Sequence, residues 1–438
     1  MERRVEGQVE VISHRVIHGE CVETLRQLAR EGLLVDAVCT DSPYHLASIV
    51  ARFGGTDAAP AQIGATGAYR RASQGFMGQQ WDGGDVAFRP ETWRRVFDVM
   101  KPGAHLVAFA ATKGYHRLAC AIEDAGFEIR DMLTWLYGVG MPKSHNMHGD
   151  LEGWGTGLKP AVEPIVLAQK PISENSIEAN MLRWGVGGLH IDACRLFTEE
   201  ELKAGSGKLW SHYKGKRFAP GASVNKNGAW KSEEEYEGVS KPGRWPANVL
   251  HDGSDEVLDA FAEYGERGAV APVTRRSSDA EMESRRNVYN RGFGGTVDPD
   301  AKTFQGDSGT AARFFYSSKA TVGERVFQCR ECGAHTMGRP DCGHADMRTH
   351  PTVKPPSLMR WLVDLICPAG GLVLDPFAGT GTTAFAARLA GMSSLSIEMD
   401  ADHIRDIGIR LGMPVEQLIN SAVAAAPTNH GAQGDMFG

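Results

Sequence analysis

The sequence predicts an α/β fold around a largely parallel sheet, on two observations. In residues 10–170, and again from residue 350 onward, short apolar runs that resemble buried strands alternate with segments of helical spacing. This alternation is typical of parallel strands joined by helices. In addition, polar or glycine-rich motifs directly follow the apolar runs at residues 35–39 and 371–374. Ligands of α/β proteins bind beyond the carboxyl ends of strands, so these two motifs are candidates for one shared site.

The N-terminal stretch supplies the first set of elements. The spacing of Val22, Leu25 and Leu28 predicts a helix over residues 21–31, followed by a strand at 33–39. A polar, glycine-rich loop spans residues 54–84. Beyond it we expect helices at 91–100 and 115–125, and strands at 105–110, 127–136 and 163–167.

The alternation is interrupted in residues 172–325, where Gly, Ser, Lys and Asn dominate and periodicity is weak. This composition favours a loop-rich insertion. The pattern then returns, with helices expected at 356–367, 382–389 and 401–411 and strands at 371–374 and 394–398. The sequence thus predicts five segments: 1–171, the insertion 172–325, a Cys/His-rich segment 326–349, 350–422, and a disordered tail 423–438.

Composition excludes some classes of protein. A chain of 438 residues with 42% hydrophobic side chains is long for one compact domain and suits a core with a large insertion. No apolar run is long enough to span a membrane, and the N-terminus lacks the apolar stretch of a signal peptide, so we expect a cytoplasmic protein. The net charge of -7 argues mildly against a nucleic-acid partner, but residues 203–244 and 275–291 are locally basic.

The C-terminal motif, residues 375–383, reads Asp-Pro-Phe-Ala-Gly-Thr-Gly-Thr-Thr. Its glycines let the backbone approach a ligand closely, and Thr382 or Thr383 can cap the following helix. Glu398 ends the next predicted strand, where a carboxylate can accept hydrogen bonds from a ribose diol. The pattern predicts a nucleoside-containing cofactor held by Asp375, Pro376, Phe377, Gly379, Gly381, Thr382 and Glu398. No lysine follows the second glycine, which disfavours a P-loop.

The N-terminal motif, residues 41–44, reads Asp-Ser-Pro-Tyr. Asp41 can accept a hydrogen bond from an exocyclic amine, and Pro43 leaves its carbonyl as a second acceptor. Two acceptors keep the lone pair of an amine out of the plane and nucleophilic. Tyr44 offers an aromatic face on which a base can stack. A plain strand-to-turn segment is the alternative.

Together the motifs resemble the β-class, S-adenosylmethionine-dependent amino-methyltransferases of DNA. That family carries Asp/Asn/Ser-Pro-Pro-Tyr/Phe/Trp and Phe-x-Gly-x-Gly, and in the permuted β class the catalytic motif comes first, as here. Residues 350–355, His-Pro-Thr-Val-Lys-Pro, resemble its additional cofactor motif, which adds Thr352 and Lys354 to the cofactor-binding candidates. The resemblance implies a Rossmann-like fold with a seven-stranded, mostly parallel sheet, S-adenosylmethionine as cofactor and double-stranded DNA as partner. It also implies base flipping, a setting in restriction-modification, and a homodimer as a candidate assembly.

Ser42 departs from the family pattern, which usually has proline there. The initial Asp favours adenine N6 as the target, and cytosine N4 remains the alternative. An RNA or small-molecule methyltransferase would share the cofactor half of the chain. A nicotinamide oxidoreductase is disfavoured because the third glycine of its fingerprint is missing. A non-enzymatic DNA-binding protein would need a broken motif, and neither motif is broken.

The insertion is the expected DNA-recognition region. Its basic side chains would contact phosphates, which gives affinity without sequence information. The candidates are Lys214, Lys216, Arg217, Lys226, Lys231 and Arg244. The loop at residues 54–84, with Phe76, Met77 and Trp81, would close over DNA, or else it is an ordinary surface loop.

A cysteine cluster suggests a metal site. Cys329 and Cys332 form one close pair, and Cys342 and His344 form another. These ligand types suit a tetrahedral structural zinc, although His335 and His350 compete with His344 for the fourth place. Thiols without a metal are the alternative.

The last residues carry a further motif. Residues 433–437, Gln-Gly-Asp-Met-Phe, resemble the short peptide by which bacterial proteins bind the replication sliding clamp. Gly434 stands where that peptide usually has leucine.

Overall fold

The computed structural model describes residues 12–44, 85–138, 140, 146–196, 243–265, 309–318, 321–350 and 353–420, and the backbone of two short strands in the insertion. The chain divides into two compact units. The first comprises residues 1–193, 248–257 and 317–438, and the second 194–247 and 258–316. Residues 172–193, 248–257 and 317–325 therefore belong with the first unit, although the sequence predicts them to be part of the insertion. The loop at 54–84 and the motif at 433–437 lie outside the described residues.

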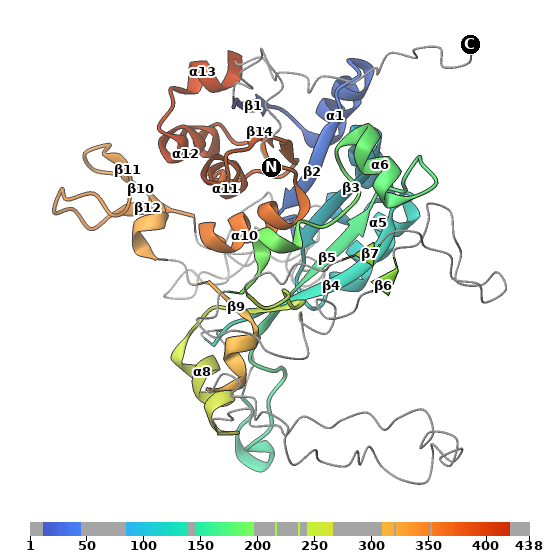
Figure 1. Ribbon diagram of the computed structural model, residues 1–438. Helices are drawn as coiled ribbons and strands as arrows, with labels where there is room; N and C mark the ends of the chain where they lie inside the picture. The colour runs from blue at the N-terminus through green and yellow to red at the C-terminus, as the bar shows by residue number, and fades with distance from the viewer. Residues whose placement is uncertain are drawn as a thin grey trace, which may run out of the picture. The chain divides into compact units, whose positions relative to one another are not determined.

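The first unit is built on a mixed, mostly parallel sheet (Figure 1). Its strand order is β1-β14-β13-β2-β3-β5-β4-β8-β9. The strands are β1 (His14–His18), β2 (Val35–Thr40), β3 (Met100–Phe109), β4 (Glu128–Leu136), β5 (Val162–Gln169), β8 (Val249–His251), β9 (Tyr316–Ser317), β13 (Leu372–Asp375) and β14 (Ser393–Glu398). Strand β5 runs antiparallel to β3 and β4, whereas the pairs from β1 to β3 and the pair β4–β8 are parallel.

The expected count of seven strands is wrong, because the sheet of the described residues has nine. The part of the sheet from β1 through β14, β13, β2, β3 and β5 to β4 has the seven strands that the family resemblance implies, although no strand was predicted at the position of β1. Strands β8 and β9 extend the sheet beyond β4. Both additions are very short and lie in or beside glycine-rich sequence, so they show no periodicity that predicts a strand.

Helices form two layers against this sheet. The α-helices are α1 (Cys21–Arg30), α4 (Pro90–Asp98), α5 (Tyr115–Asp124), α6 (Ile177–Trp184), α8 (Asp255–Ala262), α10 (Pro356–Ile366), α11 (Thr382–Leu389), α12 (Ala401–Leu411) and α13 (Val415–Asn420). Side chains of α1, α4 and α5 share one apolar core with the sheet, and those of α11, α12 and α13 form another. Leu372 and Leu374 of β13 belong to the first core, while Val373 between them is buried toward the opposite face.

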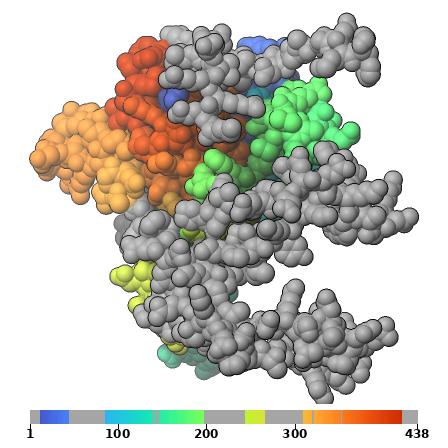
Figure 2. Space-filling view, in the orientation of Figure 1, coloured from blue at the N-terminus to red at the C-terminus, as the bar shows by residue number. Residues whose placement is uncertain are grey.

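A separate three-stranded sheet, ordered β11-β10-β12, lies in the first unit. Its strands are β10 (Val326–Cys329), β11 (His335–Met337) and β12 (Met347–Thr349), and β10 and β11 contact α12. The space-filling view shows this segment, in orange, against the red C-terminal helices (Figure 2).

The second unit contains one described strand pair, the antiparallel β6 (Gly215–Lys216) and β7 (Glu235–Tyr236). Leu196 and Arg244 form an isolated antiparallel bridge. Among the described residues of the whole chain, no helix is long and apolar enough to cross a membrane.

Candidate active site

The two sequence motifs meet because their strands are neighbours. Strands β2 and β13 pair in parallel, with Val373 opposite Ala37 and Leu374 opposite Val38. The loops that follow the two strands therefore leave the same edge of the sheet. The Thr40 hydroxyl joins them, donating a 2.7 Å hydrogen bond to Oδ1 of Asp375.

The glycine turn after β13 has the backbone that a ligand cradle needs. Gly379 has φ of +50°, and a Cβ placed on it would meet no atom within 4 Å. Gly381 has φ of +78°, and a Cβ there would lie only 2.7 Å from Cγ1 of Ile407 in α12. Glycine at the first position leaves open space beside the backbone, and at the second it permits close packing of α12.

Glu398 is held at the end of β14 by backbone amides. Its Oε2 atom accepts a 2.7 Å hydrogen bond from the Gly379 N–H, and Oε1 accepts bonds from Met399 and Asp400. A carboxylate has about four lone-pair positions, so Glu398 keeps capacity for a further donor such as a ribose hydroxyl. The open side of Gly379 and this fixed carboxylate fit the nucleoside part of S-adenosylmethionine.

Asp375 supports the turn from within the protein. The carboxyl group accepts hydrogen bonds from Thr40 and from the Phe377 N–H, and burial raises its pKa to about 6. Pro376 and Thr382 are also buried, and the Phe377 ring is half-buried. Thr382 does not cap α11, because Gly381 occupies the N-cap position and no side chain caps it.

Around Asp41 the structure assembles a charged cluster that the sequence does not predict. Lys354 was a cofactor-binding candidate, yet its Nζ atom donates a 2.7 Å hydrogen bond to Oδ2 of Asp41. The same atom lies 2.9 Å from the Tyr44 hydroxyl and 3.1 Å from Oε2 of Glu163. Burial alone would lower the pKa of Lys354, but the carboxylates of Asp41 and Glu163 outweigh it and raise that pKa above its ordinary value.

Asp41 retains an unused acceptor atom. Its Oδ1 is buried and has no hydrogen-bond partner among the residues that the structure describes. Burial raises the pKa of Asp41, the charge of Lys354 opposes this, and the charge of Glu163 adds to it. An acceptor without a partner is costly in a folded protein and is typical of a group reserved for a ligand.

The rest of the Asp-Ser-Pro-Tyr motif has distinct positions. Ser42 is buried and donates a 2.9 Å hydrogen bond to the Phe109 carbonyl, so its hydroxyl points into the fold. Pro43 and Tyr44 are half-buried. The Tyr44 hydroxyl donates a 3.0 Å hydrogen bond to Glu163, which holds the hydroxyl end of the side chain in place.

Glu163 is a site residue that sequence reasoning missed. It lies in β5, two strands from β2 in the sheet, and its side chain is 19% exposed. The one signal in the sequence is a carboxylate at the start of an apolar strand. Nothing in that signal identifies Lys354 and Tyr44 as its partners.

The structure tests few of the expected DNA contacts. Thr352 and the side chains of Lys214, Lys216, Arg217, Lys226 and Lys231 lie outside the described residues. Arg244 is buried, and its guanidinium donates a 2.9 Å hydrogen bond to the Arg313 carbonyl and lies over the Phe314 ring. Both contacts lie within the second unit.

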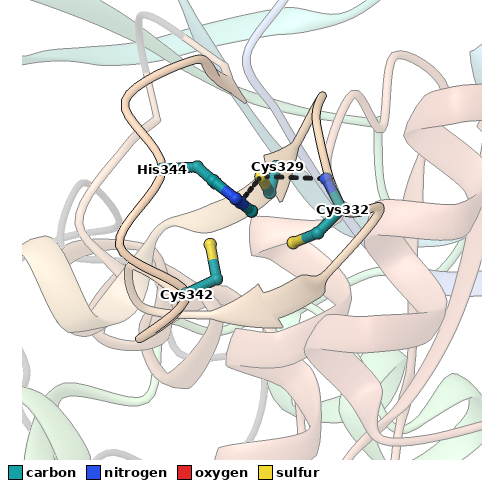
Figure 3. Close-up of side chains that lie close together, drawn as sticks. All are labelled: Cys329, Cys332, Cys342 and His344. Carbon is teal, nitrogen blue, oxygen red and sulfur yellow. Dashed lines mark hydrogen bonds between the residues drawn. The ribbon is translucent and has the colours of Figure 1, made fainter.

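The predicted metal ligands do come together. Cys329, Cys332, Cys342 and His344 point toward a common centre (Figure 3), and one ligand atom from each lies within 4.8 Å of the others. The competing His335 instead contacts Asp406, with Nε2 2.6 Å from its Oδ1. The His350 ring packs against the ring of His403.

Known proteins resemble parts of this chain. The type II methyltransferase M.HindIII of Haemophilus influenzae is 31% identical over 112 residues, which is 22% of this chain and 36% of that protein. The DNA adenine methyltransferase YhdJ of Escherichia coli is 35% identical over 65 residues, or 15% of this chain and 22% of that one. The matches therefore span about a third or less of these relatives.

A solved structure and a family model align with this chain over most of its length. The crystal structure of an M1.HpyAVI–SAM complex aligns with a TM-score of 0.36 at 14% identity, over 91% of this chain and 98% of that one. The family model for N6/N4 methyltransferases, described as DNA methylase, matches residues 35–408. Since this match covers both motifs and most of the chain, the protein belongs to the N6/N4 DNA methylase family.

Proposed function

We propose that the protein transfers a methyl group from S-adenosylmethionine to the exocyclic amine of a base in double-stranded DNA, with adenine N6 as the target. The observation that carries the proposal is the pairing of β2 with β13. It sets the unpartnered Oδ1 of Asp41 beside the glycine turn that suits the cofactor. An amine acceptor and a cofactor cradle on adjacent strands are what direct transfer requires.

In this reaction Asp41 orients the amine. Lys354 holds Oδ2, which leaves Oδ1 to accept a hydrogen bond from the substrate N–H. The Pro43 carbonyl is a second acceptor, and the two together direct the nitrogen lone pair away from the base. S-adenosylmethionine supplies an electrophilic methyl group on a sulfonium. The protein contributes mainly positioning, which fixes the distance and the angle of attack.

Oδ1 of Asp41 can also accept the proton that the amine loses. The pKa of Asp41 is raised by burial, which makes Oδ1 a better proton acceptor than an exposed aspartate would be. Lys354 nearby keeps that carboxylate ionised before transfer, because its positive charge lowers the same pKa.

Tyr44 would stack on the base once it has left the duplex. Methyltransferases extrude the target nucleotide, which costs a few kcal/mol of unstacking. Hydrogen bonds of the Tyr44 hydroxyl with Glu163 and Lys354 hold the side chain before the base arrives, so less conformational entropy is lost on binding. DNA contacts by the basic residues of the insertion, and a cytoplasmic location, remain part of this proposal.

We propose adenine rather than cytosine as the target base for two reasons. The motif begins with Asp, and one relative is named as a DNA adenine methyltransferase. Ser42 carries little weight in the choice, because its hydroxyl is bonded to the Phe109 carbonyl inside the fold.

The test uses the full chain with S-adenosylmethionine and unmethylated genomic DNA, followed by digestion to nucleosides and mass spectrometry. We expect N6-methyladenine, and none with an Asp41→Ala variant that still binds S-adenosylmethionine in calorimetry. N4-methylcytosine alone would reassign the base. No methylated nucleoside, with cofactor binding intact, would refute DNA as the substrate.

A further inference from the structure

We propose that Cys329, Cys332, Cys342 and His344 bind one Zn²⁺ ion, and that the resulting zinc clip, residues 321–350, holds α12 against the cofactor turn. The zinc site stands on its own observations. The second part, the coupling to cofactor binding, rests on the proposed function.

The ligand geometry suits tetrahedral zinc. Ligands of a tetrahedral Zn²⁺ at about 2.1–2.3 Å stand about 3.5–3.8 Å apart. One atom from each of the four residues lies within 4.8 Å of the others, with Cys329 Sγ and His344 Nδ1 3.4 Å apart. The four ligand atoms, from three cysteines and one histidine, thus need only a small inward movement to reach bonding distance.

The backbone around the ligands is arranged to support a thiolate. The Cys332 N–H donates to Sγ of Cys329 at 3.4 Å, and such bonds stabilise metal-bound sulfur. Gly333 and Gly343 have φ of +75° and +71°, so both close pairs of ligands lie at tight turns that favour glycine. None of the three cysteines is in a disulfide.

The clip needs a bound metal to fold stably, because it has very few buried apolar side chains of its own. Within residues 321–350, all of which the structure describes, the buried apolar side chains are Val326 and Cys329. Segments of fewer than about 40 residues usually need a metal or disulfides to fold. Metal binding would therefore supply much of the folding free energy of the clip.

The clip meets α12 at a buried carboxylate. Asp406 is 3% exposed, and its Oδ1 contacts His335 of β11 at 2.6 Å and Arg348 of β12 at 2.9 Å. Arg348 also donates to the Gln328 side chain of β10 at 2.9 Å. Side chains from all three strands of the clip are thus linked to one position on α12.

The next turn of α12 meets the cofactor turn. Arg410 is buried, and its Nη1 donates to the carbonyl of Glu324 in the clip at 2.8 Å. Its Nε donates to the Thr380 carbonyl, between the two glycines of the turn, at 2.9 Å. Ile407 packs on Gly381 from the same helix. A loosened clip would free α12 and, through it, the turn that fits S-adenosylmethionine.

The first experiment concerns the metal alone. We expect the purified full chain to contain about one zinc per protein by elemental mass spectrometry. Cys342→Ser should lose it, and Cys120→Ser, a change at an exposed cysteine of α5, should keep it. If Cys342→Ser does not fold, Co²⁺ exchanged into the wild-type protein gives a second readout, with thiolate charge-transfer and tetrahedral ligand-field absorption. Metal-free protein that takes up no Co²⁺, or thiols oxidised to a disulfide, would overturn the site.

The second experiment concerns the coupling. Asp406→Asn keeps all four ligands but weakens the link to Arg348 and His335, and Asp402→Asn is the matched control on the exposed side of α12. We expect Asp406→Asn to retain zinc and to bind S-adenosylmethionine about 3- to 30-fold more weakly in calorimetry, with no change for Asp402→Asn. If Asp406→Asn and Asp402→Asn bind S-adenosylmethionine with equal affinity, the proposed coupling between the clip and the cofactor turn is wrong. If the wild type binds no S-adenosylmethionine, the coupling falls with the proposed function, while the zinc content still decides the site.

Discussion

The Nζ atom of Lys354 lies 2.7 Å from Oδ2 of Asp41, although 313 positions separate the two residues in the chain. Lys354 also contacts Tyr44 and Glu163, so one buried cation joins the residues that follow β2 to a residue of β5. The lysine of the motif at residues 350–355 thus contacts the Asp-Ser-Pro-Tyr motif.

Replacing Lys354 should destabilise the protein strongly. Lys354→Met leaves the carboxylates of Asp41 and Glu163 close together without a cation. Breaking a buried ion pair costs about 3–5 kcal/mol, so the free energy of unfolding, measured with urea, should fall by that amount. Arg95→Met, which removes surface ion pairs with Glu91 and Asp98, should cost no more than about 1 kcal/mol. Equal losses in the two variants would contradict a central role for Lys354.

Glu163 should set the acid limit of activity. Asp41 must be ionised to accept the amine proton, and its pKa is raised by burial and further by the charge of Glu163, against the lowering effect of Lys354. Glu163→Gln removes that negative charge and should lower the pKa of Asp41. The acid limb of the single-turnover rate against pH should therefore move to lower pH.

A surface change is the control for this shift. Glu91→Gln, in the exposed first turn of α4, should leave the profile in place. A limb that stays fixed or moves to higher pH in Glu163→Gln would show that the group titrating is not Asp41 in this environment.

Alanine substitutions at the two glycines of the turn should have different effects, one on binding of S-adenosylmethionine and the other on stability. Gly379→Ala places a methyl group in open space at positive φ, which should cost about 1–2 kcal/mol of stability and block the approach of S-adenosylmethionine. Gly381→Ala drives its Cβ toward Ile407 and should lower the melting temperature more, because two packed elements must separate. Calorimetry with S-adenosylmethionine and thermal unfolding of both variants separate the effects. Tight binding by folded Gly379→Ala would refute the cradle.

His14 should make the protein sensitive to acid. Burial, and less so the charge of Arg388, lowers the pKa of His14 to about 4, and its Nδ1 lies 2.9 Å from the Ser394 hydroxyl. A histidine with a lowered folded pKa stabilises the protein above the unfolded value of 6.5, and this contribution is lost as pH falls from 6.5 toward 4. The loss is at most about 3 kcal/mol.

A His14→Asn variant should lose less stability than the wild type over that pH range, as measured by urea unfolding at several pH values. His18→Asn, at the exposed end of the same strand, is the matched control and should follow the wild type. If His14→Asn and the wild type lose stability in parallel, another group is responsible.

Local sequence predicted the elements that have strong periodicity. The helices at residues 382–389 and 401–411 agree with α11 and α12, because apolar side chains recur at helical spacing. Strands β1 and β8 were not predicted, because they are short and show no clear periodicity. Their place in the sheet depends on partners far along the chain, β14 and β4.

The site was predictable to the extent that its groups belong to motifs. Asp41, Tyr44, Gly379 and Glu398 lie in local patterns whose chemistry can be argued from residue types. Glu163 could not be found in this way, because its importance comes only from contacts with Tyr44 and Lys354. The choice of His344 over His335 likewise depends on tertiary structure, since Asp406 engages His335.

The parallel pairing of β2 with β13 also fixes the distance between the two motifs. Neighbouring strands stand about 4.8 Å apart wherever backbone hydrogen bonds join them, whatever side chains they carry. The separation between the end of β2, which leads to Asp41, and the end of β13, which leads to the glycine turn, is therefore set by peptide geometry. Under the proposed function, exchange of the insertion for another would alter which nucleotide is bound, while the distance over which the methyl group is transferred would stay the same.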